Sequence, residues 1–206
     1  MKKSILITIL FYLVKSGFAQ NNENPLRDVK AQLTLQNTNI LSSNSYGLGL
    51  EFSFFSSKNF SHGLYFSALE SSLQSNFNYV TTEPVLNMND IGILNELEVF
   101  HIKKLQFSTN LTTGFTYLRL GNNLIKEGIG IREQSQKFHS EYYFLTQPGI
   151  NLTMPITYTE KSLAINLSAQ AKYRLLLGNN ELFIGENVQN SFTFLIGLSI
   201  VKFKNK

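Results

Sequence analysis

The sequence predicts an all-β protein: an eight-stranded antiparallel up-and-down transmembrane β-barrel behind a signal peptide. Three observations predict it: eight segments alternate apolar and polar residues, the links between them are alternately short and long, and aromatic residues gather near segment ends. In the clearest segment, 105–117, most odd positions are apolar or aromatic and most even positions are small and polar. Because successive side chains of a strand point to opposite faces, this segment has one apolar face and one polar face. A tilted strand needs about 9–11 residues to cross a bilayer, and this segment is close to that length.

The N-terminal residues have the composition of a secretory signal peptide. Two lysines precede an apolar run over 5–14, and small residues lead to Ala19. We expect cleavage after Ala19. A helix that spans a membrane needs about 20 apolar residues, and this run is shorter. The alternative to a cleaved signal peptide is an N-terminal anchor on the membrane surface. The predicted organisation is a signal peptide at 1–19 and a barrel domain at 20–206.

The overall composition excludes several function classes. Hydrophobic residues make up 43% of the chain, which argues against disorder. The net charge is only +4 and the Lys and Arg residues form no dense patch, so we expect no nucleic-acid partner. The sequence contains no cysteine, which excludes lipid attachment through a cysteine after the apolar run.

The first three strands are predicted from the alternation of apolar and polar residues, which is clearer in the second strand than in the first and third. Part of the first, 28–37, also fits a short helix, whereas the second, 45–55, alternates without a break. The facing of the third, 62–74, is ambiguous, and we choose the parity that keeps Glu70 out of lipid. The predicted outward residues are Val29, Ala31, Leu33 and Leu35 of the first strand, Tyr46, Leu48, Leu50, Phe52 and Phe54 of the second, and Tyr65, Leu69 and Leu73 of the third.

The fourth strand is expected at 90–102 and the fifth at 105–118, joined by a tight turn. Strict alternation in the fourth strand would point Asn95 toward lipid, so a slip or a β-bulge is expected there. The fifth strand turns its odd-numbered residues outward. The fourth is predicted to turn Ile91, Ile93, Leu97 and Val99 outward and Glu96 and Glu98 inward.

The last three strands are expected at 139–154, 162–175 and 191–203. Pro148 lies within the sixth strand, where it removes a donor from the ladder of backbone hydrogen bonds, so we expect a β-bulge at Pro148 and Gly149. The predicted outward residues are Tyr142, Phe144, Ile150 and Leu152 of the sixth strand, Leu163, Ile165, Leu167, Ala169, Ala171 and Tyr173 of the seventh, and Phe192, Phe194, Ile196, Leu198 and Ile200 of the eighth.

The links and the aromatic residues agree with this reading. Links after the third, fifth and seventh strands are long, at 75–89, 119–138 and 177–190, and those after the second, fourth and sixth are short. Outer-membrane barrels have short periplasmic turns and longer extracellular loops. Aromatic residues expected near the extracellular ends are Tyr46, Phe115, Tyr117, Tyr142, Phe144, Tyr173, Phe192 and Phe194, and near the periplasmic ends Phe52, Phe54, Tyr65 and Phe107. They resemble two interfacial girdles, although aromatics favour any strand.

Charged residues gather at the positions predicted to face the lumen. Six of them form a candidate lumenal charge cluster: Glu51, Glu96, Glu98, Glu141, Lys172 and Arg174. Lys30 and Glu70 are also expected to face the lumen. A turn at 157–161 is expected to bring Glu141 near Lys172 and Arg174. Because side chains about fill an eight-stranded barrel, we interpret the cluster as a salt-bridged plug, with a polar path or a ligand seat as the alternative.

The sequence predicts no catalytic site, no metal site and no cofactor. His62, His101 and His139 lack the spacing of metal ligands. Residues His139, Ser140 and Glu141 are the types found in a hydrolase triad, but on a strand Ser140 would face away from the other two.

The two lysines of the signal, its end at Phe18-Ala19-Gln20, the eight alternating segments and a last strand ending near Phe203 resemble the small outer-membrane β-barrel proteins of Bacteroidetes. This is the broad porin-like group that includes PorT-type proteins, and the resemblance spans roughly 1–206. It implies location in the outer membrane, surrounding outer-membrane lipid, and insertion by the barrel-assembly machinery through the C-terminal aromatic strand. It implies no catalytic residues.

Our leading interpretation is a non-enzymatic structural or surface-interaction protein that presents long extracellular loops, with a protein partner that the sequence does not identify. Transport or a secretion-accessory role, as in PorT-type proteins, is the alternative. A lipid-modifying enzyme is a third reading.

Overall fold

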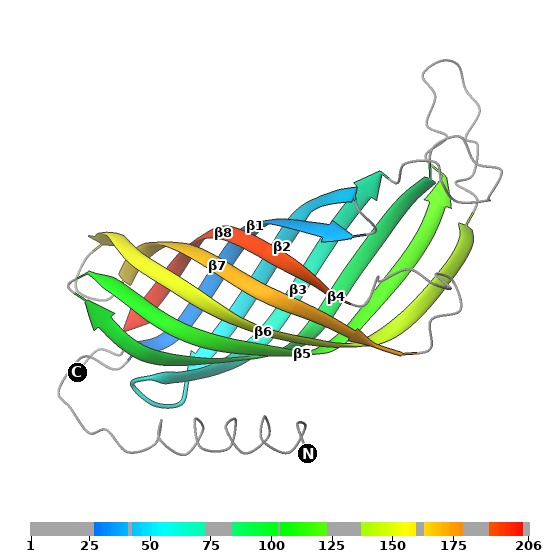
Figure 1. Ribbon diagram of the computed structural model, residues 1–206. Helices are drawn as coiled ribbons and strands as arrows, with labels where there is room; N and C mark the ends of the chain where they lie inside the picture. The colour runs from blue at the N-terminus through cyan, green and yellow to red at the C-terminus, as the bar shows by residue number, and fades with distance from the viewer. Residues whose placement is uncertain are drawn as a thin grey trace.

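Eight antiparallel strands follow one another around a closed barrel, and the last pairs with the first (Figure 1). This computed structural model describes residues 27–40, 43–72, 84–102, 104–122, 137–159, 163–178 and 190–203, so the expected signal peptide at 1–19 lies outside the described residues. The strands are β1 (Arg27–Ile40), β2 (Ser43–Phe55), β3 (Phe60–Ser72), β4 (Pro84–Ile102), β5 (Leu105–Asn122), β6 (Lys137–Thr159), β7 (Leu163–Leu177) and β8 (Asn190–Phe203). The predicted fold is confirmed.

The two ends of the barrel differ. One end carries the short connections 56–59, 103–104 and 160–162 together with the start of β1 and the end of β8, and we call it the turn end. The other end carries the short connection 41–42 and the longer connections 73–83, 123–136 and 178–189, and we call it the link end. Figure 1 shows β4, β5 and β6 extending past the other strands at the link end.

These three strands are longer than the sequence predicts. Strand β4 begins at Pro84 instead of 90, and β5 and β6 gain residues as well. The extensions do not alternate cleanly, since Val85 and Leu86 are both apolar and both buried. Backbone pairing between β4 and β5 nevertheless continues to Pro84 and Asn122, because a ladder of hydrogen bonds requires no alternation of side chains.

The outer wall of the barrel is apolar and the inner wall is largely polar. On β8, Phe192, Phe194, Ile196, Leu198 and Ile200 are 53–64% exposed on the outside, whereas Ser191, Thr193 and Ser199 are buried inside. This distribution is the reverse of that in a soluble protein, and it requires apolar surroundings for the outer wall. The barrel is therefore a transmembrane barrel, and the predicted outward faces of β1, β2, β6, β7 and β8 are confirmed.

Among the residues that the structure describes, no helix is long and apolar enough to cross a membrane.

The predicted facing of β3 is wrong. Tyr65 and Leu69 point inward and are almost fully buried, while Glu70 is exposed on the outer wall; Leu73 lies outside the described residues. Glu70 lies only two residues from the end of β3, so its carboxylate reaches the membrane boundary and not the hydrocarbon. Inside, the Tyr65 hydroxyl donates a hydrogen bond to Gln36 at 3.2 Å. The rule that a charged side chain avoids lipid does not predict the facing of a residue this close to a strand end.

The two expected irregularities are resolved differently. Pro148 keeps its register against Leu111, and the ladder with β7 omits two positions around it without a shift, so the expected bulge is absent there. The register between β6 and β7 shifts instead between Pro155 and Thr157. In β4 a shift does occur, between Glu98 and Phe100.

That shift leaves the facing of Asn95 unchanged. The side chain remains half-buried on the outer wall, opposite His62 of β3.

Aromatic side chains meet across neighbouring strands on the outer wall. The ring centroids of Tyr117 and Tyr142 lie 4.9 Å apart, as do those of Tyr173 and Phe192 toward the link end of β7 and β8. Near the turn end, Phe100 stacks on Phe107 at 4.6 Å. Both predicted girdles thus have outward aromatics, with the exception of Tyr65.

Candidate functional site

Among the described residues, three buried ion pairs cross the lumen. The Lys172 ammonium lies 2.9 Å from a Glu51 carboxylate oxygen, Arg174 pairs with Asp90, and Lys30 pairs with Glu96; all six side chains are at most 8% exposed. The pairs join β7 to β2, β7 to β4 and β1 to β4, and none of these strands are neighbours in the barrel. The pairs therefore connect opposite walls of the lumen.

Each buried carboxylate also accepts hydrogen bonds from uncharged side chains. Asp90 accepts bonds from the hydroxyls of Ser67 and Thr116, at 2.6 and 2.7 Å. Glu96 accepts them from Ser108 at 2.5 Å and Asn151 at 2.8 Å. A buried ion pair is favourable only when such further bonds offset the desolvation of its charges, and these two carboxylates meet that condition.

Lys172 has a second neighbour besides Glu51. Its ammonium lies 4.4 Å from the centre of the Tyr65 ring, which faces inward from β3. A cation over an aromatic face is stabilised by the ring quadrupole. The inward position of Tyr65, which the sequence analysis missed, is therefore part of the ion-pair layer.

An apolar layer lies next to the ion pairs on the link side. On β4, Met88 is two residues closer to the link end than Asp90, and on β7 Leu176 is two residues beyond Arg174. The inward residues of this apolar layer are at most 3% exposed: Leu69, Leu86, Met88, Leu118, Leu145 and Leu176. Alternation predicted a polar lumen and not this layer, although Leu118 and Leu145 already have the inward parity of β5 and β6.

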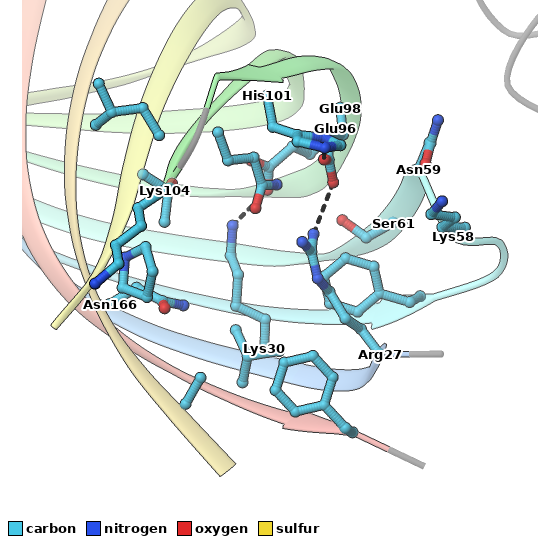
Figure 2. Close-up of a pocket in the computed structure, with 18 residues that line it drawn as sticks. Arg27, Lys30, Lys58, Asn59, Ser61, Glu96, Glu98, His101, Lys104 and Asn166 are labelled. Atoms are coloured by element: carbon cyan, nitrogen blue, oxygen red, sulfur yellow. Dashed lines mark hydrogen bonds and ion pairs between the residues drawn. The ribbon is translucent and has the colours of Figure 1, made fainter. Parts of the chain in front are cut away.

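A cavity of about 350 Å³ lies at the turn end, and we call it the vestibule. Figure 2 shows Arg27 and Lys30 of β1 extending toward Glu98 and Glu96 of β4. The Arg27 guanidinium lies 2.8 Å from Glu98, and His101 lies 3.5 Å from the same carboxylate. Phe203, the last residue of β8, also lines the vestibule, so it does not face lipid.

The predicted charge cluster is present as separate pairs. Glu51, Glu96, Lys172 and Arg174 lie in the ion-pair layer, and Glu98 lies in the vestibule. The layer also includes Asp90, which the sequence analysis did not name although it has the inward parity of β4. Glu70, expected inside, lies outside.

The expected pairing of Glu141 with Lys172 and Arg174 is wrong. Strand β6 continues to Thr159, which moves the turn along the chain and sets Lys172 opposite Gly149. The pairing of β6 with β7 ends at Phe144, three residues short of Glu141. Glu141 instead accepts a hydrogen bond from Tyr143.

Within the described ranges, no group of three or more His, Cys, Asp or Glu side chains could hold a metal ion. Ser140 pairs with Arg119 on the outward parity of β6, whereas Glu141 faces the other way. The ion pairs in the lumen can hold the walls of the barrel together, and the charged side chains of the vestibule can bind polar groups.

The fold and its interior define a small transmembrane β-barrel with an ion-paired lumen. No family model and no curated protein matches the chain. Its fold is similar to that of Neisserial surface protein A, at 7% identity over 84% of this chain and 94% of that one, with a TM-score of 0.49. Ail, the attachment invasion locus protein of Yersinia pestis, is 10% identical over 87% and 99% with a TM-score of 0.46 in its complex with a heparin analogue. The outer membrane protein OprG of Pseudomonas aeruginosa is 9% identical over 87% and 95%, with a TM-score of 0.34.

Proposed function

We infer that this protein is a plugged barrel of the bacterial outer membrane that acts through its surface, without passing solutes and without catalysis. The observation that carries this proposal is the double layer in the lumen. Ion pairs that connect opposite walls lie directly against buried leucine and methionine side chains. An eight-stranded barrel has an interior about filled by its own side chains, so these two layers leave little room for solutes.

The location follows from the same physics. A closed barrel with an apolar outer wall belongs in a bilayer, and barrels of this kind are proteins of outer membranes. We propose cleavage after Ala19, insertion by the barrel-assembly machinery, and outer-membrane lipid as the surrounding partner.

The lengths of the connections support one orientation. Outer-membrane barrels keep short turns in the periplasm and longer loops outside, so the turn end and the vestibule face the periplasm and the link end faces the medium. The connections 73–83, 123–136 and 178–189 would then be the segments available to a protein partner on the cell surface.

Single-cysteine labelling on intact cells tests this surface role, because the natural chain contains no cysteine. Gly128→Cys places a thiol in the 123–136 connection, and Lys104→Cys places one in the exposed turn between β4 and β5. A maleimide that does not cross the membrane should label the first variant and leave the second unlabelled until cells are opened. The reverse pattern would place the link end in the periplasm and remove the proposed role.

Two other functions have distinct signatures. The resemblance to PorT-type proteins suggests transport or a secretion-accessory role, and stable ion conductance would favour it. Release of acyl chains from lipid A, lost in Ser140→Ala, would favour a lipid-modifying enzyme.

A further inference from the structure

The outer wall has a hollow of about 480 Å³ that crosses β2 to β6. One row of paired outward residues runs through it in the order Leu48, Ala68, Asn89, Tyr117 and Tyr142. Ala68 and Asn89, adjacent in this row, are small, and the residues on either side of them are large. The hollow is therefore a consequence of residue size: Ala68 and Asn89 form its floor, and leucine and tyrosine side chains form its sides.

The hollow lies at the boundary of the apolar wall. One step closer to the link end on β3 to β6, the outward residues are polar: Glu70 follows Ala68, Asn87 precedes Asn89, Arg119 follows Tyr117, and Ser140 precedes Tyr142. On the turn side the next outward row is apolar, with Phe66, Ile91 and Phe115. The hollow thus opens onto a polar rim on one side and onto hydrocarbon on the other.

Asn89 has an unusual position on this wall. Its side chain is exposed on the outer face and has no hydrogen bond to any residue of the described chain. An amide facing hydrocarbon without a hydrogen-bond partner is unfavourable. A lipid whose ester, amide or hydroxyl group lies at this depth would supply that partner.

We propose that the hollow binds one lipid A molecule of the outer leaflet. An acyl chain lies between the leucine and tyrosine sides, its ester or amide linkage meets Asn89, and the phosphorylated sugar lies against the polar rim that contains Arg119. The rim offers the cation Arg119 to a phosphate, and Glu70, Asn87 and Ser140 offer hydrogen-bonding groups to sugar hydroxyls, which suits a phosphorylated and acylated sugar. The choice of lipid A over a phospholipid rests on the proposed orientation, because the hollow then opens in the extracellular leaflet.

Native mass spectrometry of the full-length barrel measures this binding. The protein is refolded in vesicles of phosphatidylethanolamine and hexa-acylated lipid A, extracted into mild detergent, and analysed for retained lipid. We expect one lipid A per barrel. Ala68→Phe fills the floor and should abolish retention, and Asn89→Leu should lower it by about tenfold through the lost hydrogen bond.

Each variant has a matched control on the same wall. Ala169→Phe adds the same ring on β7, away from the hollow, and Asn95→Leu removes an outward asparagine of β4 that does not line the hollow. Both should retain lipid A like the natural sequence. A shift in gel migration on boiling confirms that each variant is folded.

Equal retention by Ala68→Phe and Ala169→Phe would overturn the proposal, as would a natural sequence that retains no lipid or only phosphatidylethanolamine. The cysteine labelling described above is independent of this result. Loss of lipid with correct labelling refutes the lipid site alone, whereas inverted labelling refutes the proposed orientation.

Discussion

Lys172 of β7 reaches across the lumen to Glu51 of β2, with its ammonium 2.9 Å from the carboxylate and both side chains at most 1% exposed. The two strands are separated by β8 and β1 in the barrel, so this contact depends on the closure of the whole sheet. Contacts of this kind stabilise the barrel as a unit. We therefore expect substitutions that break them to destabilise the whole barrel.

Removing Arg174 should strongly destabilise the barrel. In Arg174→Ala, Asp90 is left as a buried carboxylate without its cation, which costs about 3–5 kcal/mol in the free energy of unfolding. Adding Asp90→Ala should recover part of the loss. Urea unfolding in lipid vesicles measures both, and a double-mutant cycle gives the coupling.

Glu141 supplies the control for that cycle. Because the register keeps it away from Arg174, Arg174→Ala and Glu141→Ala should be additive to within about 0.5 kcal/mol. A large coupling between Arg174 and Glu141, with none between Arg174 and Asp90, would show that the register of β6 on β7 is wrong.

The ion pair in the vestibule should contribute much less. Arg27 is 25% and Glu98 12% exposed, so solvent screens their interaction. We expect Arg27→Ala to change the free energy of unfolding by about 0–1 kcal/mol. A loss as large as that of Arg174→Ala in the same urea titration would mean that the turn end is sealed from water.

Gly114 should not tolerate a side chain. A Cβ atom there would lie 2.0 Å from the carbonyl oxygen of Ile91 and 2.4 Å from the Cα of Gly92, so β4 and β5 would have to move apart. We expect Gly114→Ala to cost about 1–3 kcal/mol, as for overpacked interiors. At Gly178 the nearest atom, 3.0 Å away, belongs to the Tyr143 side chain, so Gly178→Ala should cost much less. Equal unfolding midpoints would contradict this reading.

Strands β3 and β7 show how far the sequence predicts the facing of side chains in this barrel. On β7, unbroken alternation correctly predicts the outward residues from Leu163 to Tyr173. On β3, both parities contain large apolar residues, so alternation alone does not choose between Tyr65 and Phe66. Burial of Tyr65 depends on Gln36 and Lys172, which are distant in the sequence and meet it only when the barrel closes.

Pairing of charges is a second limit. Inward parity is a local property, and it correctly places Glu51, Glu96, Lys172 and Arg174 inside. The partner of each charge depends on strand ends and bulges, such as the extension of β6 to Thr159 and the shift after Pro155. Small errors in these positions add up along a strand, which is why Glu141 was expected beside Arg174.

The plugged lumen is the central claim, and ion conductance across a planar bilayer tests it most directly. The natural sequence should insert without stable conductance steps. A variant that combines Asp90→Ala, Arg174→Ala and Leu118→Ala removes parts of both layers and, if it folds, should conduct. Large and stable conductance steps from the natural sequence would contradict the account.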